Sequence, residues 1–405
     1  MAMAFIAPGP SPVSRLTILS AFGPLAAMHA ALDRRGIGLP CSAAALFPDR
    51  RADELERAIS AAADHYPVLS SRLVWDGDQP LLEVGSGGPT GLSDPLCFRP
   101  DDTGIWGYRL TETAAGVWFE AAFVHAVADG PSMLRLLGAV AGELQGRSPE
   151  PFRSPARPPP RQKPMAGWLP GFLLEHARGY DGLAAANRCA RAGSTFAILP
   201  PASAERLQQD AGRSGVAARL GAAAASSLLQ QQRGRAEGEV YLNVPISRSA
   251  AAPLGGFGFD GSSVRLPLRL SRGDGLDDLA ARAGVRLKAR IAEGWDLNLA
   301  RLLDGGGEKR MKFAAVQARK EPDPCLTVSW KPRIKGIGPS HGVSRAACFA
   351  AAPTLHLSAH AGEEGLSLSL TTPQEPGARR ELLLEIIARL GLDEPGEIHE
   401  LAALV

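Results

Sequence analysis

The chain has 405 residues, a length that suits about two or three domains or one large two-lobed unit. Hydrophobic residues make up 45% of it and charged residues 21%, proportions typical of a globular protein with a substantial core. The formal net charge of +2 excludes the positive excess that binding to nucleic acid or to an anionic membrane would require.

Residues 1–147 are predicted to form a first lobe of helices and strands. The N-terminus has no basic segment followed by a long apolar stretch, and the apolar run at 21–32 is too short to span a bilayer. Residues 51–65 place apolar side chains at helical spacing behind early acidic residues, which predicts an amphipathic helix. The following elements are expected to be strands at 68–75 and 81–84, a hairpin at 105–110 and 117–124, and a helix at 131–144.

A proline-rich segment separates this lobe from the rest of the chain. Residues 148–164 contain seven prolines, whose fixed φ angles favour an extended linker. A helix is expected at 172–192, so we assign 148–193 to a linker and crossover helix and 194–405 to a C-terminal lobe. A long surface loop within one domain is the alternative.

The C-terminal lobe is predicted to be rich in strands, with helices between them. Leu382, Ile386 and Leu390 lie at helical spacing in the last helix. The expected strands span 194–199, 240–246, 263–270, 325–330, 346–350, 354–359 and 366–370, and the expected helices span 203–210, 216–232, 276–292, 297–317 and 379–390.

Residues 116–132, G-V-W-F-E-A-A-F-V-H-A-V-A-D-G-P-S, carry the strongest chemical signal. An apolar strand ends at His125, and Asp129 and Gly130 follow in a turn before a helix. An imidazole, with its ordinary pKa of about 6.5, suits a general base at the end of a rigid strand. The alternative is a buried, hydrogen-bonded histidine with Asp129 as a turn or helix-capping residue. Asp129 as an orienting partner of His125 or as a member of an ion pair also stays open.

Other reaction chemistries have little support in the sequence. There is no G-x-S-x-G motif, no phosphate-binding loop, and no cysteine positioned to pair with His125. Five scattered cysteines without C-x-x-C argue against a disulfide framework or a structural zinc, and predict a reducing, cytoplasmic setting. His356 and His360 lie in a strand-like pattern that holds them far apart, so we expect no metal site.

The motif F-V-H-A-V-A-D-G-P-S resembles the H-H-x-x-x-D-G signature of the condensation-domain and HxxxD acyltransferase superfamily. That superfamily includes free-standing condensation domains, polyketide-associated acyltransferases, wax ester synthases and alcohol acetyltransferases. Two further segments support the resemblance. Residues 55–84 resemble its early helix–strand segment, and V-Y-L-N-V-P-I-S-R at 240–248, with L-G-G-F-G-F-D-G after it, resembles its second-half P-x-x-x-R…L-G-x-F segment.

The resemblance implies an α/β (α+β) fold of two chloramphenicol-acetyltransferase-like lobes, each a mixed sheet with flanking helices, and a channel between them. It implies that His125 deprotonates a hydroxyl or amine acceptor, which attacks the thioester of acyl-CoA or of a phosphopantetheine carrier protein. No covalent acyl-enzyme and no permanently bound cofactor are expected. Asp129 would pair with Arg248, and the Gly130 amide would help to hold the oxyanion. A monomer acting in natural-product or lipid biosynthesis, with no nucleic acid and no transmembrane segment, fits this interpretation.

The chain departs from the family pattern at two places. Val124 replaces the first histidine of the doublet, and V-S-W-K-P-R replaces a Ser-Asn-Gly segment. Ser329, Trp330 and Ser132 are therefore candidates for contact with the substrate or the oxyanion. Alternatives are a non-catalytic binding or docking module, and a channel used for another base-dependent reaction such as cyclisation or elimination. A basic group in the second half predicts either solvated loops or contact with coenzyme A phosphates; its members are Lys309, Arg310, Lys312, Arg319, Lys320, Lys331, Arg333 and Lys335.

Overall fold

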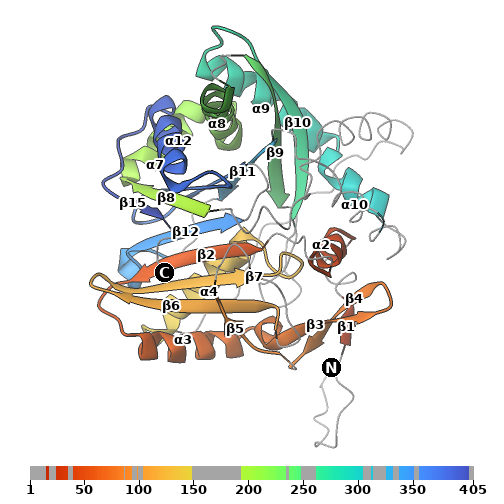
Figure 1. Cartoon of the computed structure of the whole chain (residues 1–405), viewed down its shortest axis with the longest axis vertical. Helices are drawn as coiled ribbons and strands as arrows, with labels where there is room; N and C mark the ends of the chain where they lie inside the picture. The colour runs from red at the N-terminus through yellow and green to blue at the C-terminus, as the bar shows by residue number, and fades with distance from the viewer. Residues whose placement is uncertain are drawn as a thin grey trace, which may run out of the picture.

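The computed structural model describes residues 15–17, 24–34, 40–85, 87–93, 98, 104–147, 193–233, 237–247, 261–303, 312, 325–331, 337–350 and 355–400. The chain is arranged as two lobes, each built on a β-sheet (Figure 1). Of the expected linker and crossover helix at 148–193, only Gly193 lies within the described residues, where it begins a strand; the predicted ion-pair residue Arg248 lies outside them. In the part of the chain that is described, no helix has the length and apolarity needed to cross a bilayer.

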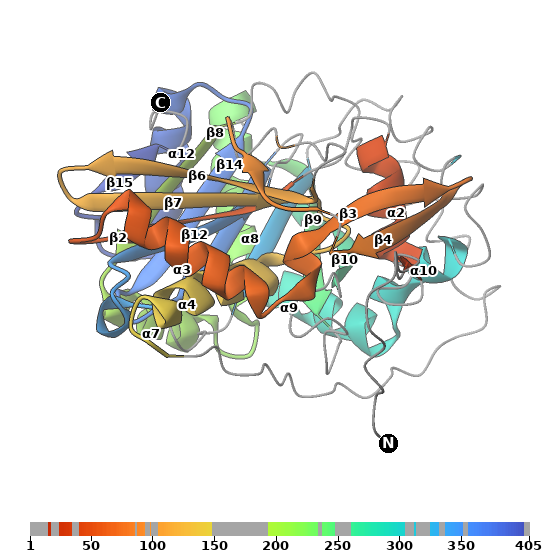
Figure 2. The same ribbon diagram turned by 90° about the horizontal axis from the view of Figure 1, so that it is seen from below.

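The N-terminal lobe contains a five-stranded sheet that is antiparallel except where β5 pairs with β6. Two helices, α3 (Ala52–Asp64) and α4 (Gly130–Glu143), cover one of its faces (Figure 2). The strands, in spatial order, are β12 (Arg345–Ala350), β2 (Cys41–Phe47), β7 (Gly116–Phe123), β6 (Trp106–Thr113) and β5 (Thr90–Gly91). The predicted hairpin is thereby confirmed as β6 and β7.

Strand β2 lies between β12 and β7 in this sheet and is buried on both faces. Cys41, Ala43, Ala45 and Phe47 pack into the core beneath α3 and α4. The intervening Ala44 and Leu46 belong to a second cluster, which joins the two sheets through side chains that include Trp118, Phe196 and Phe349. Alternate side chains of a strand point to opposite faces, so one short Ala-rich strand connects both layers.

The C-terminal lobe contains a seven-stranded mixed sheet in which β11 pairs in parallel with β9 and β13. Its outer face is covered by apolar side chains of the helices α7 (Pro201–Ala211), α8 (Val216–Arg233), α9 (Leu276–Ala292) and α12 (Pro376–Arg389). The strands, in spatial order, are β10 (Gly261–Leu270), β9 (Gly238–Ser247), β11 (Cys325–Lys331), β13 (Leu355–Ala361), β14 (Leu366–Thr372), β8 (Gly193–Leu199) and β15 (Ile398–Glu400).

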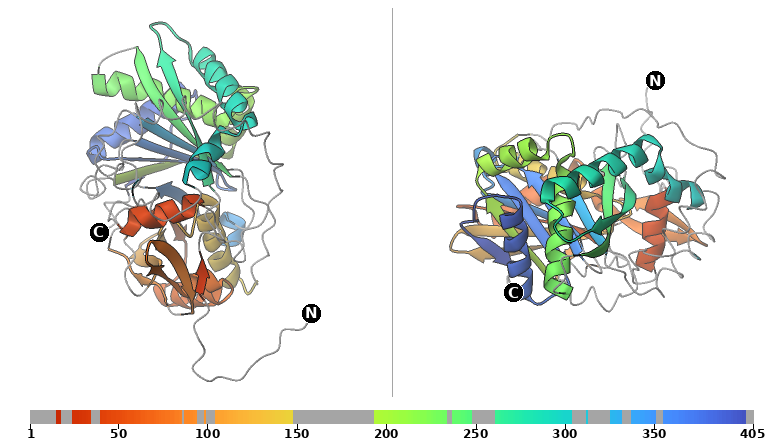
Figure 3. Two further views of the ribbon diagram at one scale, coloured as in Figure 1. Left: turned by 90° about the vertical axis from the view of Figure 1, so that its right-hand side faces the viewer. Right: turned by 90° about the horizontal axis from the view of Figure 1, so that it is seen from above.

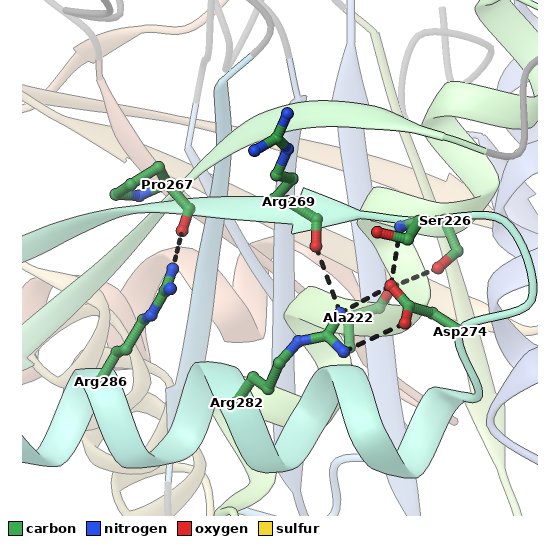
Figure 4. Close-up of polar contacts among 8 residues, drawn as sticks. Ala222, Ser226, Pro267, Arg269, Asp274, Arg282 and Arg286 are labelled. Carbon is green, nitrogen blue, oxygen red and sulfur yellow. Dashed lines mark hydrogen bonds and ion pairs between the residues drawn. The ribbon is translucent and has the colours of Figure 1, made fainter.

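Helix α9 is tied to the edge strand β10 by arginine side chains (Figure 4). Arg282 donates to both carboxylate oxygens of Asp274, at 2.6 and 3.1 Å, and to the carbonyl of Arg269. Arg286, one turn later, donates to the carbonyl of Pro267 at 3.2 Å. These bonds occupy carbonyl groups of an edge strand that would otherwise be open to pairing.

A three-stranded sheet extends the N-terminal lobe, in the order β1 (Arg15–Thr17), β4 (Gln79–Val84) and β3 (Ser71–Asp76). The expected strand at 68–75 is shorter than predicted, because Pro67–Ser70 forms a 3-10 helix first. Helix α2 (Pro24–Arg34) lies at the border between the lobes and contacts β4 and the short helix α10 (Asn298–Leu303) (Figure 3). The predicted helix at 297–317 is confirmed for α10 only, since most of its later residues lie outside the described part.

Strand β12 comes from the second half of the chain but pairs with β2 of the first half. Its Ala346, Ala347, Cys348 and Phe349 are all buried. The C-terminal half therefore supplies the edge strand of the N-terminal sheet, and β12 also contacts β13 and β14 of its own half. The expected mixed α/β architecture of two lobes is confirmed.

Candidate active site between the sheets

His125 lies in the turn between β7 and α4, where the strand leaves the N-terminal sheet. The Val124 amide donates to the carbonyl of Ile105 at 3.0 Å, and the Val124 side chain is buried in the core. The His125 side chain is half-buried. An apolar residue at 124 thus anchors the turn, and the imidazole projects from a rigid strand end.

One hydrogen bond fixes the chemical form of the His125 ring. Its Nδ1 lies 2.9 Å from the carbonyl oxygen of Ala128. A carbonyl oxygen can only accept, so Nδ1 carries the hydrogen and, in the neutral ring, the lone pair is on Nε2. Burial lowers the pKa of His125 and outweighs the Ala128 bond and the Asp129 charge, both of which raise it. The ring is therefore neutral near pH 7 and able to accept a proton at Nε2.

A second imidazole, which the motif analysis missed, faces the first. His29 of α2 has its ring centroid 4.8 Å from that of His125. Burial, and then the neighbouring His125, hold the pKa of His29 well below its usual value. The only sequence signal was a histidine interrupting an apolar helical run, which does not reveal what it faces.

Asp129 is the N-cap of α4. Its Oδ1 accepts from the backbone N–H of Ser132 at 2.9 Å and from the Ser132 hydroxyl at 2.7 Å. The carboxylate is thus bonded to the start of the helix, as the capping interpretation predicts. Ser132 is fully buried and donates its hydroxyl to Asp129. The partner expected for this carboxylate, Arg248, is outside the described residues, so their ion pair stays a prediction.

Gly130, the first residue of α4, lies directly against the side chain of Lys331. A Cβ at position 130 would stand 2.1 Å from Lys331 Cε and 3.1 Å from Nζ. Glycine leaves room at this point for the long side chain that a strand of the other lobe places there, and a larger residue would have to displace it. Lys331 of β11 thus lies beside the motif residues His125, Asp129 and Gly130, which are close together in the sequence.

Lys331 is buried, with 6% of its surface exposed. Its Nζ donates to the Ser358 hydroxyl on β13 at 2.5 Å. The expectation that Lys331 lies in a solvated loop is wrong, because β11 continues through it and turns it inward. Contact of Lys331 with coenzyme A phosphates stays a prediction. Of the other members of the basic group, only Lys312 lies within the described residues, and it is exposed.

The alternation of β11 separates the two candidates beside Lys331. Ser329 shares its face with Lys331, is half-buried and pairs in register with Ser358. Trp330 points to the opposite face and packs against the core of the C-terminal lobe. Ser329 therefore lies on the face that carries Lys331, and Trp330 on the face covered by helices.

His356 and His360 of β13 are buried beside Lys331. The His356 Nδ1 lies 3.2 Å from the carbonyl of Ala350, and the His360 Nε2 lies 3.9 Å from a Glu364 carboxylate oxygen. Burial, and then the Lys331 charge, lower the pKa of each ring to about 3. Within the described residues no group of three side chains is arranged to hold a metal ion.

The arrangement can perform base-assisted chemistry. It combines a neutral imidazole whose Nε2 can accept a proton, a helix N-terminus, and a buried cationic side chain from the opposite lobe. A proton acceptor and a source of positive potential at one point can support attack of a nucleophile on a carbonyl group.

No protein-family model matches the chain, and no curated protein matches it at the sequence level. Solved structures do match. Polyketide synthase associated protein 5 from Mycobacterium tuberculosis aligns over 93% of this chain and 98% of its own, with a TM-score of 0.59 and 14% identity. The first condensation domain of the calcium-dependent antibiotic synthetase, in complex with a substrate analogue, covers 93% and 96%, with a TM-score of 0.59 and 17% identity.

A third similar structure is a double mutant of the starter condensation domain of rhizomide synthetase, in complex with C8-CoA and Leu-SNAC. It aligns over 91% of this chain and 93% of its own, with a TM-score of 0.53 and 13% identity. The likenesses cover both lobes and nearly the full length of each partner. The chain therefore has the two-lobed, chloramphenicol-acetyltransferase-like fold of condensation domains and polyketide-associated proteins, as the sequence resemblance predicted.

Proposed function

We propose that the protein is an acyltransferase that moves an acyl group from a CoA or carrier-protein thioester to a hydroxyl or amine acceptor. The observation that carries the proposal is the hydrogen bond between His125 Nδ1 and the Ala128 carbonyl. It leaves the lone pair of a neutral, half-buried imidazole on Nε2, which is the form that a general base requires.

In the proposed reaction, His125 Nε2 takes the proton from the acceptor as its oxygen or nitrogen attacks the thioester carbonyl carbon. The carbonyl π electrons move to oxygen, and the Gly130 amide at the start of α4 helps to hold that charge. When the carbonyl re-forms, the C–S bond breaks and the thiolate takes the proton back from His125. No covalent acyl-enzyme and no resident cofactor take part.

The other site residues have supporting roles in this proposal. Asp129 and Ser132 fix the start of α4, and Asp129 pairs with Arg248. Ser329 is the better candidate for a substrate contact than Trp330, because it shares the face of Lys331. The similar condensation domain in complex with C8-CoA and Leu-SNAC supports thioester substrates. We expect a cytoplasmic monomer acting in natural-product or lipid biosynthesis.

The test is thiol release from a panel of acyl-CoAs in the presence of hydroxyl and amine acceptors, followed by mass spectrometry of the product. We expect His125→Ala to lose about 100-fold or more of kcat, while retaining the circular dichroism spectrum of the wild type. His65→Ala is a matched control, because His65 is exposed and bonded to Glu143 on α4. Full activity in His125→Ala would contradict the assignment of the base.

A non-catalytic binding or docking module is the second candidate. Burial of Val124 favours it, because the resemblance places the first histidine of the doublet there and here the position is part of the core. A docking module would bind acyl-CoA or a carrier protein without releasing thiol at any enzyme concentration. Calorimetric binding without turnover across the panel would therefore replace the catalytic proposal with this one.

A further inference from the structure

Lys331 makes an unusual set of contacts for a buried lysine. Its Nζ has three donor hydrogens, and the hydrogen bond it makes within the described residues goes to a neutral hydroxyl, that of Ser358. No carboxylate oxygen of the described residues lies within 4.0 Å of Nζ. Burying an ammonium without a close anion costs several kcal/mol, so a site that keeps one has a use for the charge.

The described groups around Lys331 do not supply that anion. Burial lowers the pKa of His356 and His360 to about 3, which leaves both rings neutral at pH 7. Burial also raises the pKa of the Cys348 thiol to about 11 and that of the Cys41 thiol still further, so neither is a thiolate. The nearby Asp129 carboxylate is bonded to Ser132 at the start of α4.

The ammonium lies at the N-terminal end of α4, beside the proposed base. Nζ is 3.1 Å from where a Cβ of Gly130 would stand, at the positive end of a helix of 14 residues. Pro131 has no N–H, and the Ser132 N–H is taken by Asp129. Gly130 is therefore the donor left in the first turn, next to a fixed positive charge. Two sources of positive potential thus meet where His125 would activate a nucleophile.

We propose that the Lys331 ammonium stabilises the oxyanion that forms on the thioester carbonyl, which makes Lys331 a catalytic residue of the reaction. This inference rests on the proposed acyl transfer and deepens it. As the acceptor attacks, His125 gains a proton and the carbonyl oxygen gains the electron pair of the broken π bond. Lys331 faces that oxygen charge without changing its own protonation. The charge returns to the C=O bond when the thiolate leaves and recovers the proton from His125.

Recognition of a substrate carboxylate is the competing use of the charge. It is disfavoured because the neutral His356 donates Nδ1–H to Ala350, so its Nε2 carries a lone pair and cannot donate to a carboxylate oxygen. A carboxylate spreads its charge over two oxygens and is held best by a set of donors that reaches both. A single developing oxygen charge, opposite one ammonium and one amide, fits the donors present.

The test compares Lys331→Met with the wild type in the thiol-release assay. Methionine keeps the length and apolar body of the side chain and removes the charge. We expect kcat to fall by about 100- to 1,000-fold with little change in KM for acyl-CoA, because the charge acts in the transition state. We also expect the melting temperature to stay equal or rise, since the removed ammonium is buried and has no carboxylate within 4.0 Å among the described residues. A merely structural lysine would give the opposite change in melting temperature.

The pH profile provides an independent measurement. His125 is faced by His29 from α2, Asp129 at the start of α4, Lys331 from β11 and His356 from β13. Lys331 is among the groups that lower the pKa of His125. The acid limb of kcat/KM should therefore move to higher pH in Lys331→Met. Lys288→Met, an exposed site on α9, is the matched control and should leave rate, melting temperature and profile unchanged.

The outcomes separate this inference from the proposed function. If the wild type turns over and His125→Ala does not, but Lys331→Met stays within about threefold of the wild-type kcat, the role of Lys331 is wrong and the acyl transfer stands. If the wild type releases no thiol, the proposed function falls and this role with it. If Lys331→Met does not fold, Lys331→Gln is measured in its place, and full activity in that variant overturns the role.

Discussion

The α-carbon of Gly130 and the side chain of Lys331 are in direct contact across the two lobes, so that a Cβ at 130 would stand 2.1 Å from Cε. The atom it would meet is near the end of a flexible side chain, which can move aside. Gly130→Ala should therefore fold, and we expect it to displace the ammonium and lower kcat by up to about 100-fold. Steady-state kinetics and thermal unfolding measure the two effects separately.

Gly377→Ala is the control for this variant. Gly377 also lies in the first turn of a helix, α12, and nothing lies within 4 Å of where its Cβ would stand. It tests the effect of alanine at a helix start without the contact. Equal kcat values for the two alanine variants would rule out displacement of Lys331.

Asp129 caps α4, so its removal should affect the stability of the fold more than the rate of catalysis. Asp129→Ala removes the acceptor of the Ser132 N–H and hydroxyl, so we expect a loss of about 1 kcal/mol in the free energy of unfolding. Asp129→Asn keeps an acceptor and should lose less. Denaturant unfolding should show a larger loss for Asp129→Ala than for His125→Ala, and equal losses would argue against the structural role.

Because His356 and His360 are buried, we expect the free energy of unfolding to fall in acid. Their pKa values in the folded protein are about 3, below the ordinary 6.5. Between these pH values the histidines are protonated in the unfolded chain and neutral in the folded protein. Each ring therefore lowers the free energy of unfolding as pH falls from about 6.5 to 3, by up to about 1.4 kcal/mol per pH unit. Above about pH 6.5 neither ring contributes a pH dependence.

The measurement for this prediction is denaturant unfolding between pH 4 and 8. His356→Gln should flatten the acid side of the stability curve, because glutamine takes no proton in this range. An unchanged slope in His356→Gln would contradict the burial of a neutral ring.

His29 covers His125, and its removal should change the base. His29→Ala opens the 4.8 Å contact to water, and burial is the main cause of the lowered pKa of His125. The pKa of His125 should therefore rise toward its ordinary value, and the acid limb of kcat/KM should move with it. His29→Phe retains the cover and should keep the wild-type profile. An NMR titration of the His125 ring measures the same change without turnover.

Much of the fold follows from periodicity in the sequence. The helix α3, the hairpin of β6 and β7, and the strand end at His125 are confirmed because their apolar spacing is regular. Strand β2 was missed, since its residues C-S-A-A-A-L-F include three alanines, which favour helix over strand. Its strand form comes from burial between two layers, which a local pattern does not record.

The part of the site that lies within one sequence motif was predictable. His125, Asp129 and Gly130 are adjacent in sequence, and their positions follow from a strand, a turn and a helix cap. Lys331 and His29 reach the same point from distant segments, and only tertiary packing joins them. Successive side chains of a strand point to opposite faces. Extending the predicted strand by one residue beyond Trp330 would therefore have placed Lys331 on the same face as Ser329.

Strand β12 has a consequence for how the protein can be made. It pairs with β2 from Cys41 to Leu46, so the N-terminal sheet is complete only after Ala350 has been synthesised. Until then β2 is an open edge, and a fragment that stops before β12 would offer that edge to other chains and aggregate. The N-terminal lobe therefore cannot complete its sheet without a strand from the second half of the chain.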